Sequence, residues 1–243
     1  MLATARLRAE ADGSGATRLA VLRSEPPLLL RPTGPNTVHL VGGAAGPLGG
    51  DRLRIEVNVG PGASLTVRAV AASLALPGAD GAPSRLEITA SVAAGGRLSW
   101  LPEPLIAAAG CRHTTQTTID VAAGASLQWR DELQCGRHGE LPGDVQLITG
   151  LRVRNVEIYR HKLAVGPGAP GWSGPAVLGD ARAIGSLLIV HPAWLEAGPP
   201  PARVLGPAAA AMPLAGPAVL VNAVGADTRS VRQILDAAVW DTG

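Results

Sequence analysis

Two short segments place a cysteine close to a histidine. Cys111 precedes His113 by two residues, and Cys135 precedes His138 by three. A thiolate and an imidazole are soft and borderline ligands, so these four side chains are candidates for a structural or transit site that holds zinc or nickel. The chain has only these two cysteines, and such spacings also arise by chance. A pair of cysteines with no metal role is therefore the alternative.

Carboxylates offer a second kind of cation site. They are concentrated in the polar segment 129–140 and recur at two earlier points of the chain, the full set being Asp51, Glu103, Asp131, Glu132 and Glu140. Oxygen ligands and water hold a passing divalent ion weakly enough for it to leave, whereas a thiolate would trap it. The alternative is a solvated loop, in which Arg137 and Glu140 only form a salt bridge that ties the loop down.

Enzymatic machinery is not found in the sequence. There is no nucleophile elbow and no phosphate-binding loop, and the glycine cluster around Gly42 and Gly46 lacks the spacing of a dinucleotide fingerprint. The five histidines show no zinc-protease arrangement. We therefore predict no catalytic residues and a protein that is not an enzyme.

A repeated strand pattern must position these side chains. Leu53, Ile55, Val57 and Val59 alternate with polar residues, the period of a half-buried strand, and the run ends at a glycine turn. The same pattern returns twice at intervals of similar length, and the three turns are marked by Gly62, Gly95 and Gly124. Each unit is predicted to be a hairpin that stacks on the next, unless glycine turns recur here only by chance. The fold class is mainly β, a β-helix-like superhelical stack of hairpins with few short helices.

The C-terminal part adds weaker signals. Residues 187–191 and 219–222 are strand candidates, and residues 207–212 are ambiguous between a loop and a short helix. The one clear helix is expected over residues 227–240, where Asp227 or Thr228 can cap it and apolar residues up to Val239 fall on one face. The longest helix is therefore expected near the C-terminus.

Charge and hydropathy exclude several function classes. The 21 basic and 19 acidic residues give a net charge of +2 with no dense basic run, so nucleic acid is not an expected partner. No run of 18 apolar residues exists, and the N-terminus has no signal-peptide pattern, so we expect no membrane association. A cytoplasmic location with reduced cysteines is the resulting expectation.

Three motifs in this order resemble the family of urease accessory proteins UreD, also called UreH. They are Gly49-Gly50-Asp51-Arg52-Leu53, Trp100-Leu101-Pro102-Glu103 and Gly136-Arg137-His138-Gly139-Glu140. The resemblance is best over residues 25–160 and continues through a C-terminal strand and helix at 219–240. It implies a single UreD-like domain over residues 1–243.

The resemblance implies a non-enzymatic maturation factor. Members bind apo-urease and act with UreF and with UreG, a GTPase, to place nickel in the urease active site. Nickel would be cargo that crosses an internal passage, with no tightly bound cofactor. Segment 129–140 would then lie at or beside this route, and Glu140 would matter more than Cys135. The alternatives are a stand-alone nickel metallochaperone that uses the cysteine–histidine pairs, and an unrelated β-solenoid enzyme acting on polysaccharide, which would need a carboxylate pair facing a long groove.

Overall fold

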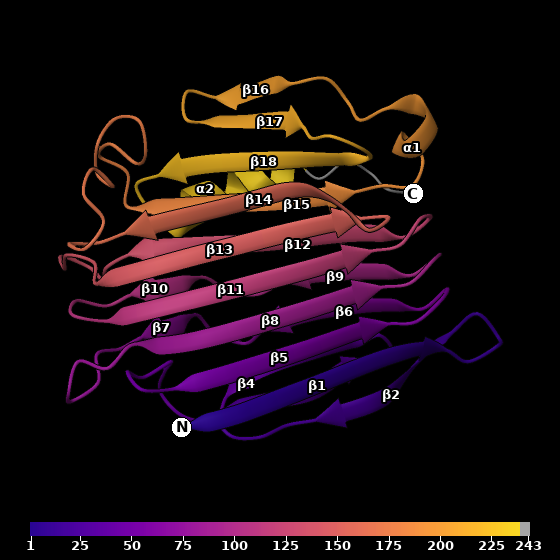
Figure 1. Cartoon of the computed structure of the whole chain (residues 1–243), viewed down its shortest axis with the longest axis horizontal. Coiled ribbons are helices and arrows are strands. Elements are labelled where there is room, and N and C mark those ends of the chain that lie inside the picture. Colours follow the sequence, from indigo (N-terminus) through magenta and orange to yellow (C-terminus); the bar gives the residue numbers. More distant parts are fainter. Residues whose placement is uncertain (239–243) are drawn as a thin grey trace.

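The predicted glycine turns connect two β-sheets that lie face to face (Figure 1). The computed structural model describes residues 1–238. Strand β5 (Arg52–Val59) belongs to one sheet, and β6 (Ser64–Ala69), which follows the turn at Gly62, belongs to the other. β5 pairs in parallel with β1 and β8, and β6 pairs in parallel with β4 and β9. The chain is a β-solenoid of about four turns, so the predicted mainly β, β-helix-like class is confirmed.

The hairpins predicted within each unit are wrong. A hairpin would pair β5 with β6 and leave the apolar sides of both strands uncovered, because both would face the same way. In the observed arch the apolar side chains of β5, such as Val57, pack toward those of β6, such as Val67, and each strand pairs instead with its counterpart in the next turn. Pairing between successive turns therefore satisfies the backbone hydrogen bonds, and the turn that joins the two sheets brings their apolar faces together in one core.

The sheets contain seven and eleven strands. The seven-stranded sheet has the order β14-β13-β11-β8-β5-β1-β2 and comprises β1 (Leu2–Ala11), β2 (Thr17–Arg23), β5, β8 (Ser84–Val92), β11 (Arg112–Val121), β13 (Asp144–Val153) and β14 (Val156–Val165). The other sheet comprises β3 (Leu28–Gly34), β4 (Thr37–Gly42), β6, β7 (Ser73–Ala75), β9 (Arg97–Leu101), β10 (Leu105–Ala107), β12 (Ser126–Cys135), β15 (Ala183–Val190), β16 (Arg203–Gly206), β17 (Ala209–Pro213) and β18 (Ala218–Gly225). Residues 207–212, ambiguous in the sequence, largely form β17, which pairs with β18.

The strand register reproduces the sequence repeat. Leu53 on β5 pairs with Leu86 on β8, and this offset equals the interval from Gly62 to Gly95. Ile88 on β8 pairs with Thr117 on β11, and this offset equals the interval from Gly95 to Gly124. One repeat is therefore one turn of the solenoid, and equivalent side chains form inward rows along the stack.

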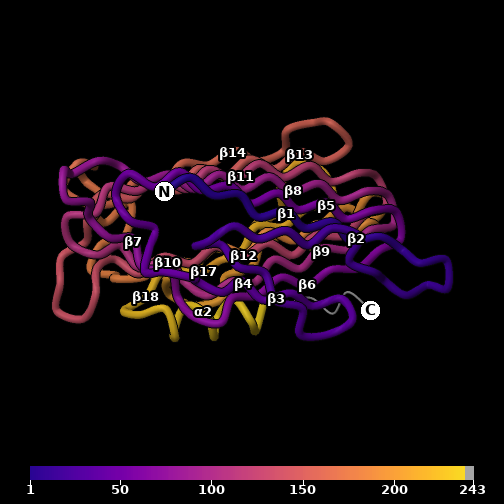
Figure 2. Tube along the Cα trace, turned by 90° about the horizontal axis from the view of Figure 1, so that it is seen from below, coloured from indigo at the N-terminus to yellow at the C-terminus, as the bar shows by residue number. Residues whose placement is uncertain are grey.

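A short helix covers the outer face of the larger sheet. Helix α2 (Thr228–Ala237) begins at Asp227, whose side chain accepts a hydrogen bond from Ser230 N at 2.8 Å. The helix lies outside the larger sheet (Figure 2), and its buried Val231 and Leu235 pack against β15 and β18. Gly185 on β15 makes room for them, because a Cβ there would lie 2.6 Å from Val231 Cγ1. The predicted C-terminal helix is thus present, and its expected extension over Val239 and Trp240 lies outside the described residues.

The other helix, α1 (Trp194–Ala197), is a single turn. Within residues 1–238 no helix is both long and apolar enough to span a membrane.

Candidate functional site

A cavity of about 360 Å³ lies between the two sheets. Its walls are mostly apolar, with Leu53, Ile55, Leu86, Ile88, Thr115 and Leu147 from the seven-stranded sheet, and Trp100, Leu105 and Asp131 from the other. Glu103 and Glu132 also line it. A mostly apolar space with a few convergent polar groups is the usual form of a binding site in a protein of this size.

The cavity exists because one wall contains more chain than the sheet needs. Trp129 and Leu133 are separated by three residues on β12, whereas their partners Trp100 and Leu105 are separated by four. One turn earlier, Val67 pairs with Trp100 and Ser73 pairs with Leu105, and five residues separate them. The wall therefore gains one residue per turn toward the N-terminus. The excess residues leave the ladder.

Asp131 is the carboxylate at the centre of the site. The period of two along β12 points it inward with its neighbours Trp129 and Leu133, which are buried in the core. Its Oδ2 accepts hydrogen bonds from Trp129 Nε1 at 3.1 Å and Thr149 Oγ1 at 3.4 Å. Burial raises the pKa of Asp131 to about 6, nearby Glu132 adds to this, and the two hydrogen bonds oppose it.

Asp131 has no cationic partner among the residues that the structure describes. The side chain is deep inside the molecule and still partly accessible, because its accessible surface faces the cavity. A cation that entered the cavity would lower the pKa of Asp131 and recover the free energy lost by its burial. Asp131 is therefore suited to a cation that arrives from outside.

Two tryptophans form the floor beside this carboxylate. The Trp100 and Trp129 rings stack with centroids 4.8 Å apart and an interplanar angle of 7°. Trp129 donates to Asp131, but Trp100 Nε1 is buried and finds no acceptor in the described part of the chain. The Trp100 indole N–H is therefore a buried donor left unsatisfied beside the cavity.

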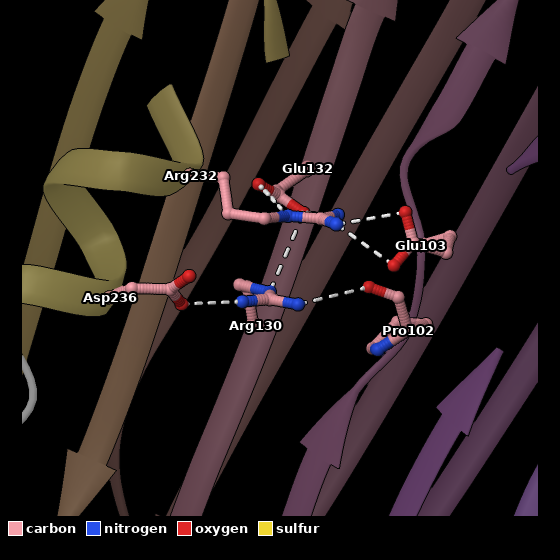
Figure 3. Close-up of polar contacts among 6 residues, drawn as sticks. All are labelled: Pro102, Glu103, Arg130, Glu132, Arg232 and Asp236. Carbon is pink, nitrogen blue, oxygen red and sulfur yellow. Dashed lines mark hydrogen bonds and ion pairs between the residues drawn. The ribbon is translucent and has the colours of Figure 1, made fainter. Parts of the chain in front are cut away.

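The other two carboxylates of the cavity are already neutralised by Arg232 of α2 (Figure 3). Arg232 Nη1 donates to both carboxylate oxygens of Glu103, each at 2.8 Å, and Arg232 Nε donates to Glu132 at 3.1 and 3.2 Å. These contacts raise the pKa of Arg232. Of the three acidic residues at the cavity, Asp131 alone lacks an arginine partner within residues 1–238.

Arg130 completes this network on the outer face of β12. Its Nη1 donates to Asp236 of α2 at 2.8 Å, and its Nη2 lies 3.5 Å from the carbonyl oxygen of Pro102. Its Nε lies 3.4 Å from a carboxylate oxygen of Glu132. Arg130 and Arg232 thus connect α2, β12 and the segment that follows β9 (Figure 3).

The cysteines and histidines selected from the sequence form no metal-binding group. In the described part of the chain, no cluster of three or more His, Cys, Asp and Glu side chains is arranged to hold a metal. Cys111 and Cys135 are buried in one apolar cluster, and burial raises the pKa of each thiol to about 11. Burial lowers the pKa of His113 to about 4, so its ring is neutral, and His138 is exposed on the loop after β12.

His113 instead takes part in a short polar row inside the solenoid. Its Nδ1 is 2.8 Å from Ser84 Oγ, and its Nε2 is 3.0 Å from Thr115 Oγ1. Thr115 also lines the cavity. Both ring nitrogens therefore have partners, and the side chain positions a hydroxyl at the cavity rather than a free ligand.

Three more candidates lie outside the cavity. Asp51 is buried and accepts hydrogen bonds from the Met1 amino group at 2.6 Å and Leu48 N at 2.9 Å, which ties β1 to the loop before β5. Glu140 accepts from Arg137 Nε at 2.8 Å and Nη2 at 2.7 Å on the loop after β12, and Arg137 lowers the pKa of Glu140 to about 2. This is the loop-tying salt bridge given above as the alternative role of the pair.

No local pattern in the sequence selects Arg232, Thr149 or the unpaired Trp100 Nε1. Arg232 lies 100 residues from Glu132 and 129 from Glu103, so nothing nearby in the chain links them. The inward position of Asp131 had a signal, because Trp129, Asp131 and Leu133 share the parity of the buried strand face.

Comparisons with known proteins agree over almost the whole chain. The family model described as UreD urease accessory protein matches residues 2–242. The urease accessory protein UreD of Streptomyces avermitilis is 46% identical over 246 residues, covering 99% of this chain and 97% of that protein. The urease accessory protein UreD 3 of Streptomyces griseus subsp. griseus is 49% identical, covering 98% and 95%. The UreD of Frankia alni is 42% identical, covering 99% and 93%.

Proposed function

Since the chain belongs to the UreD family of urease accessory proteins and is a urease maturation factor, we propose that its inter-sheet cavity is a passage for nickel on the way to the enzyme. Family membership makes it a non-enzymatic accessory protein that acts with urease and other accessory proteins. The observation that supports the passage is Asp131, a carboxylate that faces the cavity and has no cationic partner in residues 1–238.

The chemistry of this site suits transit rather than storage. Nickel is a borderline metal that accepts oxygen and water ligands, and a single carboxylate holds it less tightly than a set of thiolates or imidazoles would. An ion that must leave again needs such weak binding. The cavity has room for several water molecules, so the ion can keep part of its hydration shell. The Thr115 hydroxyl is a further oxygen at the wall.

Nickel is then cargo, and the protein needs no resident cofactor for this role. We propose UreF, UreG and the apo-urease subunits as the partners, with UreG as the GTPase that the family resemblance implies; the present sequence has no phosphate-binding loop of its own. The exposed Arg137–Glu140 loop is a candidate contact surface for one of them. A role as a stand-alone metallochaperone has less support, because the cysteine–histidine pairs form no ligand cluster in the described residues.

A urease activation assay with matched variants tests the passage. Asp131→Asn keeps the size and hydrogen-bonding oxygen of the side chain and removes its charge, and Asp120→Asn is the control on the exposed side of β11. We expect Asp131→Asn to co-purify with UreF, UreG and apo-urease but to yield urease with less nickel and less activity. Asp120→Asn should activate normally. Full activation by Asp131→Asn would contradict the passage.

A further inference from the structure

The cavity wall has a break beside β12 that only side chains close, whereas on its other side Ser73 N donates to the Pro104 carbonyl oxygen at 2.9 Å. Residues 102–104 form no ladder pair with β12, because pairing stops at Trp100 with Trp129 and resumes at Leu105 with Leu133. Pro102 and Pro104 have no N–H groups to donate. On the β12 side the segment is held instead by Arg130, which contacts the Pro102 carbonyl oxygen, and by Arg232, which binds Glu103 (Figure 3).

This segment is thin and separates two spaces. The inter-sheet cavity lies on its inner side, and a groove of about 400 Å³ lies on its outer side, lined by Glu103, Arg232 and Asp236 among others. Ala72 and Glu103 line both spaces. Ala72 belongs to the corresponding segment of the preceding turn, which also leaves the ladder between β6 and β7. The wall is therefore weak in two successive turns at the same height.

We propose that residues 102–104 are a side door of the cavity and that the ion pair between Arg232 and Glu103 is its latch. When Glu103 releases the guanidinium, the segment can swing outward and join the cavity to the groove. Glu103 then stands at the rim as a carboxylate without its arginine and can attract a cation, whereas Glu132 stays paired with Arg232 and Arg130. That this door serves nickel rests on the proposed function, whereas its existence does not.

The contacts suit a latch that opens without unfolding. The side chains of Glu103 and Arg232 are 35% and 25% exposed, so water or a competing cation can reach the pair. Glu132 is 1% exposed and keeps both Arg232 and Arg130 when Glu103 leaves. Opening therefore leaves no buried charge without a partner, which is the condition that makes breaking a buried pair costly. Helix α2 stays seated on Val231 and Leu235 throughout.

Hydrogen–deuterium exchange on the full chain measures the door directly. Glu103→Gln weakens the latch from the segment side, Arg232→Gln weakens it from α2, and Arg229→Gln is the control because Arg229 lines the same groove but has no contact with Glu103 or Glu132 in residues 1–238. We expect exchange in residues 101–107 to rise by about tenfold in both latch variants, with little change elsewhere, since loss of local contacts lowers local opening energies. Arg229→Gln should match the unaltered protein.

Thiol labelling gives a second readout. In a Cys111→Ala, Cys135→Ala background, Thr115→Cys places a reactive group on the cavity wall. Glu103→Gln should speed its labelling by a small uncharged thiosulfonate. If Arg232→Gln unfolds the protein, Glu103→Gln decides alone. Unchanged exchange and labelling in a folded Glu103→Gln protein, or equal increases in Arg229→Gln, would overturn the door.

The two proposals fail separately. If Asp131→Asn impairs urease activation while Glu103→Gln changes neither exchange nor labelling, the passage has no side door and this inference is overturned. A mobile segment in Glu103→Gln with full activation by Asp131→Asn supports the door and overturns the nickel route.

Discussion

Replacing Asp131 with asparagine should make the protein more stable at neutral pH. Burial raises the pKa of Asp131 from 3.8 to about 6, so the folded protein binds this proton more tightly than the unfolded chain does. The contribution of protonated Asp131 to the free energy of unfolding is therefore fully present below pH 4 and is lost as the pH rises from about 4 to about 6. Above this window the charged carboxylate stands unpaired inside the protein. Asparagine removes the charge and keeps an oxygen for Trp129 and Thr149.

The size of the effect follows from the pKa difference. About two pKa units at about 1.4 kcal/mol each correspond to about 3 kcal/mol of unfolding free energy. Water in the cavity solvates the carboxylate and reduces this, so we expect a gain of about 1–3 kcal/mol above pH 6. Such a gain would raise the melting temperature by several degrees for a chain of this length.

Urea unfolding at several pH values between 4 and 8 measures it. The difference between Asp131→Asn and the unaltered protein should be near zero at pH 4 and should grow to a plateau above pH 6. Asp120→Asn, on the exposed side of β11, should give no such profile. A loss of stability in Asp131→Asn at pH 7.5, or a difference that does not change with pH, would refute the reasoning. A carboxylate kept at a cost in stability points to use in function.

Other substitutions probe the packing, the buried histidine and the candidate ligands. Gly185→Ala should destabilise the protein by about 1–3 kcal/mol, because the added Cβ lies 2.6 Å from Val231 Cγ1 and 2.8 Å from Leu235 Cδ1. Gly206→Ala, where a Cβ meets nothing within 4 Å, should leave the melting temperature unchanged. The contribution of His113 to stability should be lost as the pH falls from about 6.5 to about 4, opposite in sign to that of Asp131, because burial lowers the pKa of His113 to about 4 and only the unfolded chain gains the proton. His113→Asn should reduce that loss in urea titrations. Glu140→Gln should lower urease activation more than Cys135→Ser, since the Cys135 thiol, with its pKa raised to about 11, stays protonated. The reverse ranking in co-purified complexes would move the metal to the cysteine–histidine pairs.

The repeat could be predicted from the sequence in considerable detail. The intervals between the turn glycines equal the offsets between paired strands, as Leu53 with Leu86 and Ile88 with Thr117 show. Whether each turn joins two paired strands or two sheets could not be predicted. Both need an alternating pattern and a glycine turn, and the choice depends on which distant strand supplies the hydrogen bonds.

The candidate site could likewise be predicted only in part from the sequence. Asp131 and Glu132 are both candidates, and the period of two sends them to opposite faces of β12: Asp131 points inward between the sheets, and Glu132 points outward to Arg232 at the edge of the cavity. That division was available from the sequence. The neutralisation of Glu103 and Glu132 was not, because Arg232 comes from a helix that is distant in the chain and reaches them only through tertiary packing.

The extra residues in the cavity wall have a consequence for how the protein can vary. The cavity arises from extra residues in the chain and not from small side chains in its lining. Removing the cavity would therefore require deletions rather than one larger side chain. Deleting one residue between Trp100 and Leu105, and two between Val67 and Ser73, would give these segments the three intervening residues of β12. Insertions or deletions at these two points would thus change the width of the cavity one residue at a time. The strands on either side of each point would keep their register. Length differences among relatives at these two points would set the size of what can pass.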